Sequence, residues 1–358
     1  MKIYLFDNII DGHHKKYNDA VFGLATSQQE FDLINCYSNP TRKSKNRIYN
    51  EFLKLKQISK LVFKLKKNDV LHFLYVDNMI LALFVFYRLK IINKKTTISG
   101  TLHWSTNNKF KKIMLRYMLK NNLNLVCHSG YILDQQKQIY NGKNNFLKEI
   151  RYPYFPYVSN EKESNELSKT IQEKLDKTDM IKILYFGGTR LDKGVDILLE
   201  SLKYVDNPKV SFFIIGNEEK FDKSFIENCV KNLKSDINIH LSYVNETTAS
   251  YIFSKIDYTV LPYRRFFSGE SGPLIDSLAN KVKVIAPDTP VFKKNNEGIK
   301  DVIFYSSENP IDLGRTLNNL EHYTKNDSEK EYYYQRLDLN TFKKNYQEYF
   351  KLFLGEKL

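Results

Sequence analysis

Two glycine-containing turns, each joining an apolar strand-like segment to a helix-length segment, constrain this sequence more than any other feature. The first reads Gly-Gly-Thr-Arg-Leu-Asp-Lys-Gly over residues 187–194, and the second reads Gly-Glu-Ser-Gly-Pro over residues 269–273. Free backbone N–H groups and the helix dipole favour a phosphate at both turns. The first turn also carries Arg190 and Lys193. Because no acidic metal-binding pair lies nearby in the sequence, we expect a diphosphate to be held by protein charge alone.

Short apolar runs alternate with amphipathic segments along the chain. Apolar strands separated by helices imply a parallel sheet that is covered on both faces. In the second half, segments of helical period are expected at residues 194–204 and 246–256, and strands at residues 181–186, 210–215, 237–242, 258–262, 282–286 and 301–305. The first half repeats this pattern less regularly, with strands expected at residues 2–6, 31–36, 70–74, 96–99 and 123–128.

The length of 358 residues suffices for two domains. A polar, charged segment at residues 159–179 separates the halves, and aromatic residues recur at helical spacing near the C-terminus. We expect an α/β protein with two doubly wound, Rossmann-like domains that face a cleft, where ligands of such sheets bind. The N-terminal domain is placed at residues 1–165 and the C-terminal domain at 166–338, followed by a helix at 339–358 that crosses back to the first domain.

The net charge of +14 is unevenly distributed. Residues 1–165 hold 27 Lys and Arg against 12 Asp and Glu, a net charge of +15. This excess implies an anionic partner, for which a membrane surface, a nucleic acid and a polyanionic substrate are the alternatives. Residues 53–67 and 109–120 mix cations with large apolar side chains, which suits an anionic membrane and equally suits helices that bury one face on the sheet. Because no nucleic-acid-binding motif accompanies the charge, nucleic acid is not expected as a partner.

From the N-terminal segment, the longest apolar run and the cysteines, we expect a cytoplasmic protein. Residues 2–6 are expected to form a first strand rather than a signal peptide, and the longest apolar run, residues 79–87, is too short to span a membrane. Cys36, Cys127 and Cys229 lack the spacing of a zinc site and are predicted to be small buried residues.

The second half resembles the GT-B glycosyltransferases of family 4. Residues 186–194 resemble the family's Arg/Lys turn, and Leu261-Pro262-Tyr263, Ser271-Gly272-Pro273-Leu274 and Val284-Ile285-Ala286-Pro287 resemble its donor-binding loop and helix. The resemblance extends over essentially the whole chain. It implies a retaining transferase that moves a sugar from a nucleotide-diphosphate sugar to a saccharide acceptor, with neither a metal nor another cofactor.

The resemblance also implies where and on what the enzyme acts. We expect a lipid-linked acceptor in cell-surface polysaccharide synthesis, of the capsule or O-antigen kind. The protein would then lie peripherally on the inner face of the cell membrane. The donor is expected on the second domain and the acceptor on the first.

The resemblance assigns roles to residues of both halves. His103 is expected to face the reacting sugar, and Gly12, His13 and His14 to form a loop near the acceptor or the donor phosphate. His128-Ser129 is expected to cap the next helix. The catalytic set is His103, Glu270, Arg190 and Lys193. The donor site is Gly187, Gly188, Arg190, Lys193, Tyr243, Val244, Glu270, Ser271, Gly272, Pro273, Leu274 and Asp276.

One departure from the family concerns the sugar site. The family has two glutamates separated by seven residues, and aligning the second on Asp276 places the first on Ser268, which carries no charge. Either Glu270 supplies the carboxylate from a shifted loop, or the donor sugar is held differently. A nucleotide-sugar epimerase of the same fold and a basic module that binds nucleic acid or anionic polymer are the alternative functions.

Overall fold

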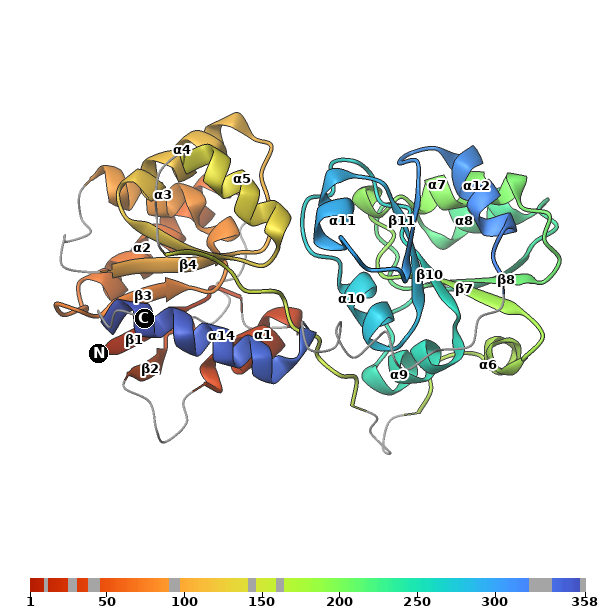
Figure 1. Ribbon diagram of the computed structural model, residues 1–358, viewed down its shortest axis with the longest axis horizontal. Coiled ribbons are helices and arrows are strands. Elements are labelled where there is room, and N and C mark those ends of the chain that lie inside the picture. Colours follow the sequence, from red (N-terminus) through yellow and green to blue (C-terminus); the bar gives the residue numbers. More distant parts are fainter. Residues whose placement is uncertain are drawn as a thin grey trace. The chain divides into compact units, whose positions relative to one another are not determined.

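The computed structural model describes residues 1–9, 12–24, 31–37, 46–89, 97–140, 146–158, 164–321 and 337–354. The chain divides into two compact units. The first unit comprises Met1–Pro153 together with Asp338–Leu358, and the second comprises Tyr154–Leu337. Figure 1 shows one parallel sheet with helices on both faces in each unit. The α/β class and the two Rossmann-like domains are thereby confirmed.

The sheet of the first unit has the strand order β2-β1-β3-β4-β5-β6, and every pair is parallel. Its strands are β1 (Lys2–Phe6), β2 (Asp32–Asn35), β3 (Val70–Phe73), β4 (Thr97–Leu102), β5 (Leu123–Cys127) and β6 (Leu147–Glu149). The first five lie where the sequence predicts them, although β4 runs on to Leu102. Residues 147–149 were not predicted as a strand.

Six helices of the described part of the chain cover this sheet. On one face lie α2 (Arg47–Val62), α3 (Ile80–Arg88), α4 (Lys109–Lys120) and α5 (Gly130–Tyr140); on the other lie α1 (Gly12–Phe22) and α14 (Leu339–Lys351) (Figure 1). Polar side chains cap the helix starts, where backbone N–H groups lack partners. Asn108 accepts from the backbone N–H of Lys111 at the start of α4, and Asp338 accepts from Thr341 at the start of α14.

The C-terminal helix α14 packs within the first unit, as predicted, and a buried hydrogen-bond network holds it there. The Tyr346 hydroxyl lies 2.6 Å from both the Tyr17 hydroxyl and Thr101 Oγ1. His72 joins the network through its Nε2 atom, 3.1 Å from Thr101 Oγ1. Burial lowers the pKa of His72 to about 3, so that its ring is neutral near pH 7.

The sheet of the second unit has the order β12-β11-β10-β7-β8-β9, again parallel throughout. Its strands are β7 (Ile181–Phe186), β8 (Val210–Ile215), β9 (Asp236–His240), β10 (Tyr258–Val260), β11 (Lys283–Pro287) and β12 (Val302–Tyr305). All six overlap the predicted strands. They are apolar because helices cover both of their faces, which leaves β8 entirely buried.

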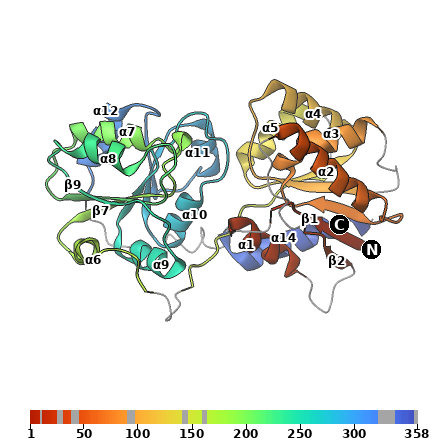
Figure 2. The same ribbon diagram turned by 180° about the vertical axis from the view of Figure 1, so that it is seen from behind.

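Within the described residues, seven helices accompany this second sheet. They are α6 (Lys169–Asp176), α7 (Val195–Ser201), α8 (Lys223–Val230), α9 (Glu246–Lys255), α10 (Gly272–Ala279), α11 (Pro290–Asn295) and α12 (Pro310–Asn318). Figure 2 shows α7, α8 and α12 on one face and α6 and α9 on the other. In the described part of the chain, no helix has both the length and the apolar character needed to cross a membrane.

The cysteines differ from the prediction. Cys127 is buried in β5, but Cys36 is half-buried and Cys229 is exposed. Cys229 lies in α8, where Ile226 is the buried side chain. The prediction of a buried residue is therefore wrong for Cys229, because it lies on the solvent side of a short surface helix.

Candidate functional site

Both predicted turns lie at the point where the strand order of the second sheet reverses. Strand β7 pairs with β8 on one side and with β10 on the other. In doubly wound sheets, ligands bind at the carboxyl ends of the strands that flank such a reversal. The first turn (residues 187–194) follows β7, and the second turn (residues 269–273) follows β10 and a connecting loop.

The backbone of the first turn depends on glycine. Gly187 and Gly194 have φ values of 119° and 64°, which side chains rarely adopt. A Cβ atom at Gly194 would lie 2.0 Å from the carbonyl oxygen of Pro262, so the first turn packs against the loop after β10. Helix α7 starts at Val195, after the two cations, in agreement with the helical segment predicted at residues 194–204. A short 3-10 turn, η2 (Leu191–Lys193), comes first.

The two cations of the first turn have different partners. The Arg190 guanidinium donates twice to the Asp192 carboxylate, from Nε at 3.0 Å and from Nη2 at 2.7 Å. Lys193 Nζ donates to the Tyr263 hydroxyl at 2.6 Å and lies 3.9 Å from the centroid of that ring. Burial, with a smaller contribution from the Arg190 charge, lowers the pKa of Lys193 to about 7.

The second turn is tied to the same tyrosine. Ser271 caps α10 by accepting from the backbone N–H of Leu274, and Pro273 lies in the first turn of that helix. Ser271 Oγ also donates to the Tyr263 hydroxyl at 3.1 Å. Tyr263 is 1% exposed and is bonded to both turns. Tyr263 was not among the predicted site residues, although it belongs to the Leu-Pro-Tyr segment.

The remaining predicted donor residues lie in the second turn, in α10 and in the chain between β9 and α9. Glu270 is half-buried and accepts from Asn295 Nδ2 at 3.0 Å, while Ser268 is half-buried two residues earlier. Asp276 accepts from the Tyr157 hydroxyl at 2.7 Å. Tyr243 is 70% exposed, whereas Val244 packs into the core beside α9. The two turns are thus brought together, but Val244 lies in the core.

In the first unit, Tyr75 contacts both His14 and His103, which were predicted as site residues. The ring of Tyr75 stacks on His14 at 3.7 Å and on His103 at 3.8 Å between centroids. His14 Nδ1 lies 2.9 Å from Asp7 Oδ2, and His103 Nε2 lies 2.9 Å from the carbonyl oxygen of Leu74. Each member of this stack follows the carboxyl end of β1, β3 or β4. Asp7 and Tyr75 were not among the predicted site residues. Their position after a parallel strand is the sequence signal that could have identified them.

The predicted histidine loop is wrong in its secondary structure. Residues 12–14 start helix α1, whose buried side includes His14, and Asp11 lies outside the described residues. The prediction for His128-Ser129 holds only for the serine. Ser129 accepts from the Ile132 N–H at the start of α5, whereas His128 Nδ1 lies 2.6 Å from the Ile150 carbonyl oxygen and joins β5 to the chain after β6.

Comparison with known proteins assigns the second unit to a family. Residues 168–336 match the model of the family described as glycosyl transferases group 1. The second unit is a group 1 glycosyltransferase domain. Its two turns at residues 187–194 and 269–273 both fall within the matched range.

Two relatives share part of their sequence with this chain. Both come from Xanthomonas campestris pv. campestris and are named GDP-mannose:glycolipid 4-beta-D-mannosyltransferase. One is 30% identical over 124 residues, which are 34% of this chain and 33% of the relative. The other is 32% identical over 108 residues, which are 30% of this chain and 30% of the relative. The matched part thus spans about a third of the length of these relatives.

Solved structures resemble the whole chain. A glycosyltransferase from Rickettsia africae ESF-5 has a TM-score of 0.67 and 16% identity, covering 99% of both chains. HepE from Anabaena in complex with UDP has a TM-score of 0.69 and 12% identity, covering 98% of this chain and all of that one. At these identities the likeness concerns the fold, and the predicted GT-B fold is confirmed.

Proposed function

We propose that this protein transfers a sugar from a nucleotide-diphosphate sugar to a saccharide acceptor. The observation that carries the proposal is the junction of the two turns at Tyr263, which places Lys193 beside the capped start of α10 at the strand-order reversal. Negative charge grows on the diphosphate as its bond to the sugar breaks. Cations and N–H groups that are already in place stabilise this charge without reorganisation.

The proposed chemistry assigns the remaining site residues. Arg190 and Lys193 neutralise the diphosphate, so that no metal ion or other cofactor is required. Glu270, held by Asn295 in α11, supplies the carboxylate that the family carries at the position of Ser268, and binds sugar hydroxyls. His103, stacked on Tyr75, contacts the sugar near the reacting carbon. Retention of the anomeric configuration follows from the family resemblance.

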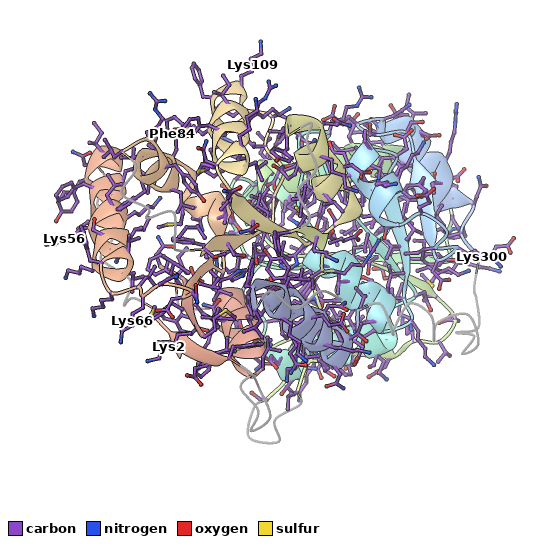
Figure 3. The ribbon with its side chains drawn as sticks, turned by 60° about the vertical axis from the view of Figure 1, so that its left-hand side comes forward. Lys2, Lys56, Lys66, Phe84, Lys109 and Lys300 are labelled. Atoms are coloured by element: carbon purple, nitrogen blue, oxygen red, sulfur yellow. The ribbon has the colours of Figure 1, made fainter. Side chains whose placement is uncertain are left out.

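The proposed acceptor is a lipid-linked saccharide in cell-surface polysaccharide synthesis, of the capsule or O-antigen kind. Two observations support it: the Xanthomonas relatives act on a glycolipid by name, and the layer formed by α2, α3 and α4 suits an anionic membrane. This layer exposes large apolar side chains among cations: Ile48, Phe52, Phe63, Leu89, Phe110 and Ile113 are at least 60% exposed. Lys56 and Lys109 point outward from α2 and α4 (Figure 3).

Opposing charge is sparse in these three helices. Helices α3 and α4 contain no acidic residue, and Glu51 of α2 is paired with Lys54 at 2.6 Å. Exposed apolar side chains surrounded by cations lower their free energy by entering the interface of an anionic leaflet. We therefore place the protein on the cytoplasmic face of the cell membrane as a peripheral protein.

The central test is diphosphate binding without a metal ion. Thermal unfolding and titration calorimetry with UDP, GDP, ADP and dTDP in the presence of EDTA should show binding of at least one of them. Arg190→Ala combined with Lys193→Ala should weaken this binding at least about 100-fold, since each removes a charge-assisted contact. Lys223→Ala combined with Arg315→Ala removes two exposed cations of α8 and α12 and should leave it unchanged. If no diphosphate binds, the proposed activity is wrong.

The chemical step is tested with the nucleotide thus identified. Transfer of radiolabelled sugars to lipid extracts should identify the donor and the acceptor, and NMR of donor and product compares their anomeric configurations. Glu270→Gln should lower the transfer rate at least about 10-fold with little change in diphosphate affinity, because its carboxylate contacts the sugar alone. Ser268→Ala is the matched control. An inverted product would contradict retention but not the transferase activity.

A further inference from the structure

The Tyr263 hydroxyl receives two hydrogen bonds from groups that lie far apart in the sequence. Lys193 Nζ donates from the first turn at 2.6 Å, and Ser271 Oγ donates from the second turn at 3.1 Å. The ring itself is packed in edge contact with Phe267 at 4.7 Å and with Phe292 at 5.6 Å. Tyr263 is thereby fixed in place while its oxygen is directed at the cation.

We propose that Tyr263 is a positioning residue that holds the Lys193 ammonium at the junction of the two turns, where the donor diphosphate binds. This inference rests on the proposed function. A phenol is suited to the task because it accepts a hydrogen bond without carrying a negative charge. A carboxylate at this position would neutralise Lys193 and repel the diphosphate, whereas a phenylalanine would offer the buried ammonium no acceptor.

The surroundings of Lys193 make its charge sensitive to this contact. The ammonium lies over the rings of Tyr263 and Phe267, at 3.9 and 4.8 Å, and is half-buried. The charged groups that face it are Arg190 and Asp192 of the same turn and Glu219 of the loop after β8. Burial lowers the pKa of Lys193 to about 7, so part of the free protein carries a neutral amine at neutral pH.

Diphosphate binding is therefore coupled to a proton. The bound anion favours the charged form of Lys193, so binding takes up a proton above pH 7 and affinity falls as the pH rises through that value. Without the phenol oxygen the buried ammonium is less favoured, and the fall in affinity moves to lower pH. If the pKa of Lys193 falls by one unit, the diphosphate affinity in this pH range falls by up to about ten-fold.

The test compares single and double variants by titration calorimetry at pH 6, 7 and 8. The ligand is whichever of UDP, GDP, ADP and dTDP binds the unchanged protein most tightly. Tyr263→Phe should weaken binding about ten-fold at pH 8 and less at pH 6, and it should have no further effect in a Lys193→Gln protein. Because the nucleotide also titrates, the Lys193→Gln protein supplies the ligand's own pH dependence.

A second tyrosine provides the control. Tyr305 is also buried in the second unit, and its hydroxyl has no hydrogen-bond partner within the described residues. Tyr305→Phe should leave the affinity and its pH dependence unchanged. Equal weakening by Tyr263→Phe in the unchanged protein and in the Lys193→Gln protein would overturn the role of Tyr263. Binding by Tyr263→Phe that is unchanged at all three pH values would also overturn it. Absence of binding to the unchanged protein would instead overturn the proposed function.

Discussion

The carboxylate of Glu219 lies directly against Gly188, so that a Cβ atom at position 188 would stand 2.0 Å from Glu219 Oε1. Glu219 belongs to the loop after β8, and its backbone N–H donates to Thr189 Oγ1 at 2.9 Å. A negative charge is thus held beside the turn that is proposed to receive a diphosphate. It partly offsets the charges of Arg190 and Lys193 before any ligand arrives.

Neutralising this carboxylate should strengthen diphosphate binding. Because Glu219 is exposed and screened by solvent, we expect Glu219→Gln to raise the affinity by only about two- to five-fold, measured by calorimetry at low ionic strength. The neighbouring Glu218 accepts from the Lys223 N–H, and Glu218→Gln serves as the control. An unchanged affinity in Glu219→Gln would show that the Glu219 charge does not influence diphosphate binding.

The close approach of Gly194 to Pro262 predicts a large loss of stability on adding one methyl group. Gly194→Ala places Cβ 2.0 Å from a backbone oxygen, in addition to the left-handed strain of about 1–2 kcal/mol. Gly298 also has a left-handed φ, of 80°, but a Cβ there meets nothing within 4 Å. Gly194→Ala should therefore lower the melting temperature clearly more than Gly298→Ala. Equal losses in calorimetric scans would contradict a tight junction between the turns.

The exposed apolar side chains of the first unit should contribute to membrane binding. Phe110 and Ile113 of α4 are 74% and 63% exposed. We expect replacing both by serine to weaken sedimentation with phosphatidylglycerol vesicles at least about ten-fold, because each inserted side chain contributes about 1.5–3 kcal/mol. High salt should weaken the binding of the unchanged protein.

A matched pair of substitutions comes from the second unit. Phe225 and Ile311 are 40% and 44% exposed, and replacing both by serine should leave vesicle binding intact. Failure of the unchanged protein to sediment with anionic vesicles at low salt would refute the membrane proposal. Equal binding to heparin or RNA and to vesicles would show that the layer recognises polyanions in general.

The buried His72 should make the first unit sensitive to acid. Its pKa is about 3 in the folded state and about 6.5 in the unfolded chain, so the unfolded state binds more protons between these values. Stability therefore falls as the pH drops from about 6.5 toward 3, by up to about 1.4 kcal/mol per pH unit, and His72 contributes no such slope above that window.

Urea unfolding at pH 4.5–7.5 measures this effect through Trp104, the chain's one tryptophan, which lies in the first unit. His72→Gln should flatten the pH dependence, although it lowers stability at pH 7 by disturbing the network of Thr101 and Ser99. The partly exposed His240 is the control, since His240→Gln should leave the slope of the first unit unchanged. A slope that persists in His72→Gln would assign the acid sensitivity to His128, whose pKa burial lowers to about 4.

The sequence predicts those parts of the structure that depend on local pattern. Apolar runs locate every strand except β6, whose Leu-Lys-Glu sequence lies at a sheet edge and needs no apolar character on both faces. A serine before Gly-Pro suits a helix start, and Ser271 caps α10 in the structure. Contacts between distant residues have no such local signal. Lys193 and Tyr263 are 70 positions apart, so only the pairing of β7 with β10 brings them together.

Helix α14 makes the order of synthesis relevant to folding. The second unit is one continuous stretch, and all of its strands are synthesised before residue 339. Tyr17 and His72, in contrast, belong to a buried network that includes Tyr346. The first unit therefore cannot complete this network until the last helix has emerged. A nascent chain that stalls within the second unit therefore holds a first unit whose sheet face lacks α14, which makes it a target for chaperones.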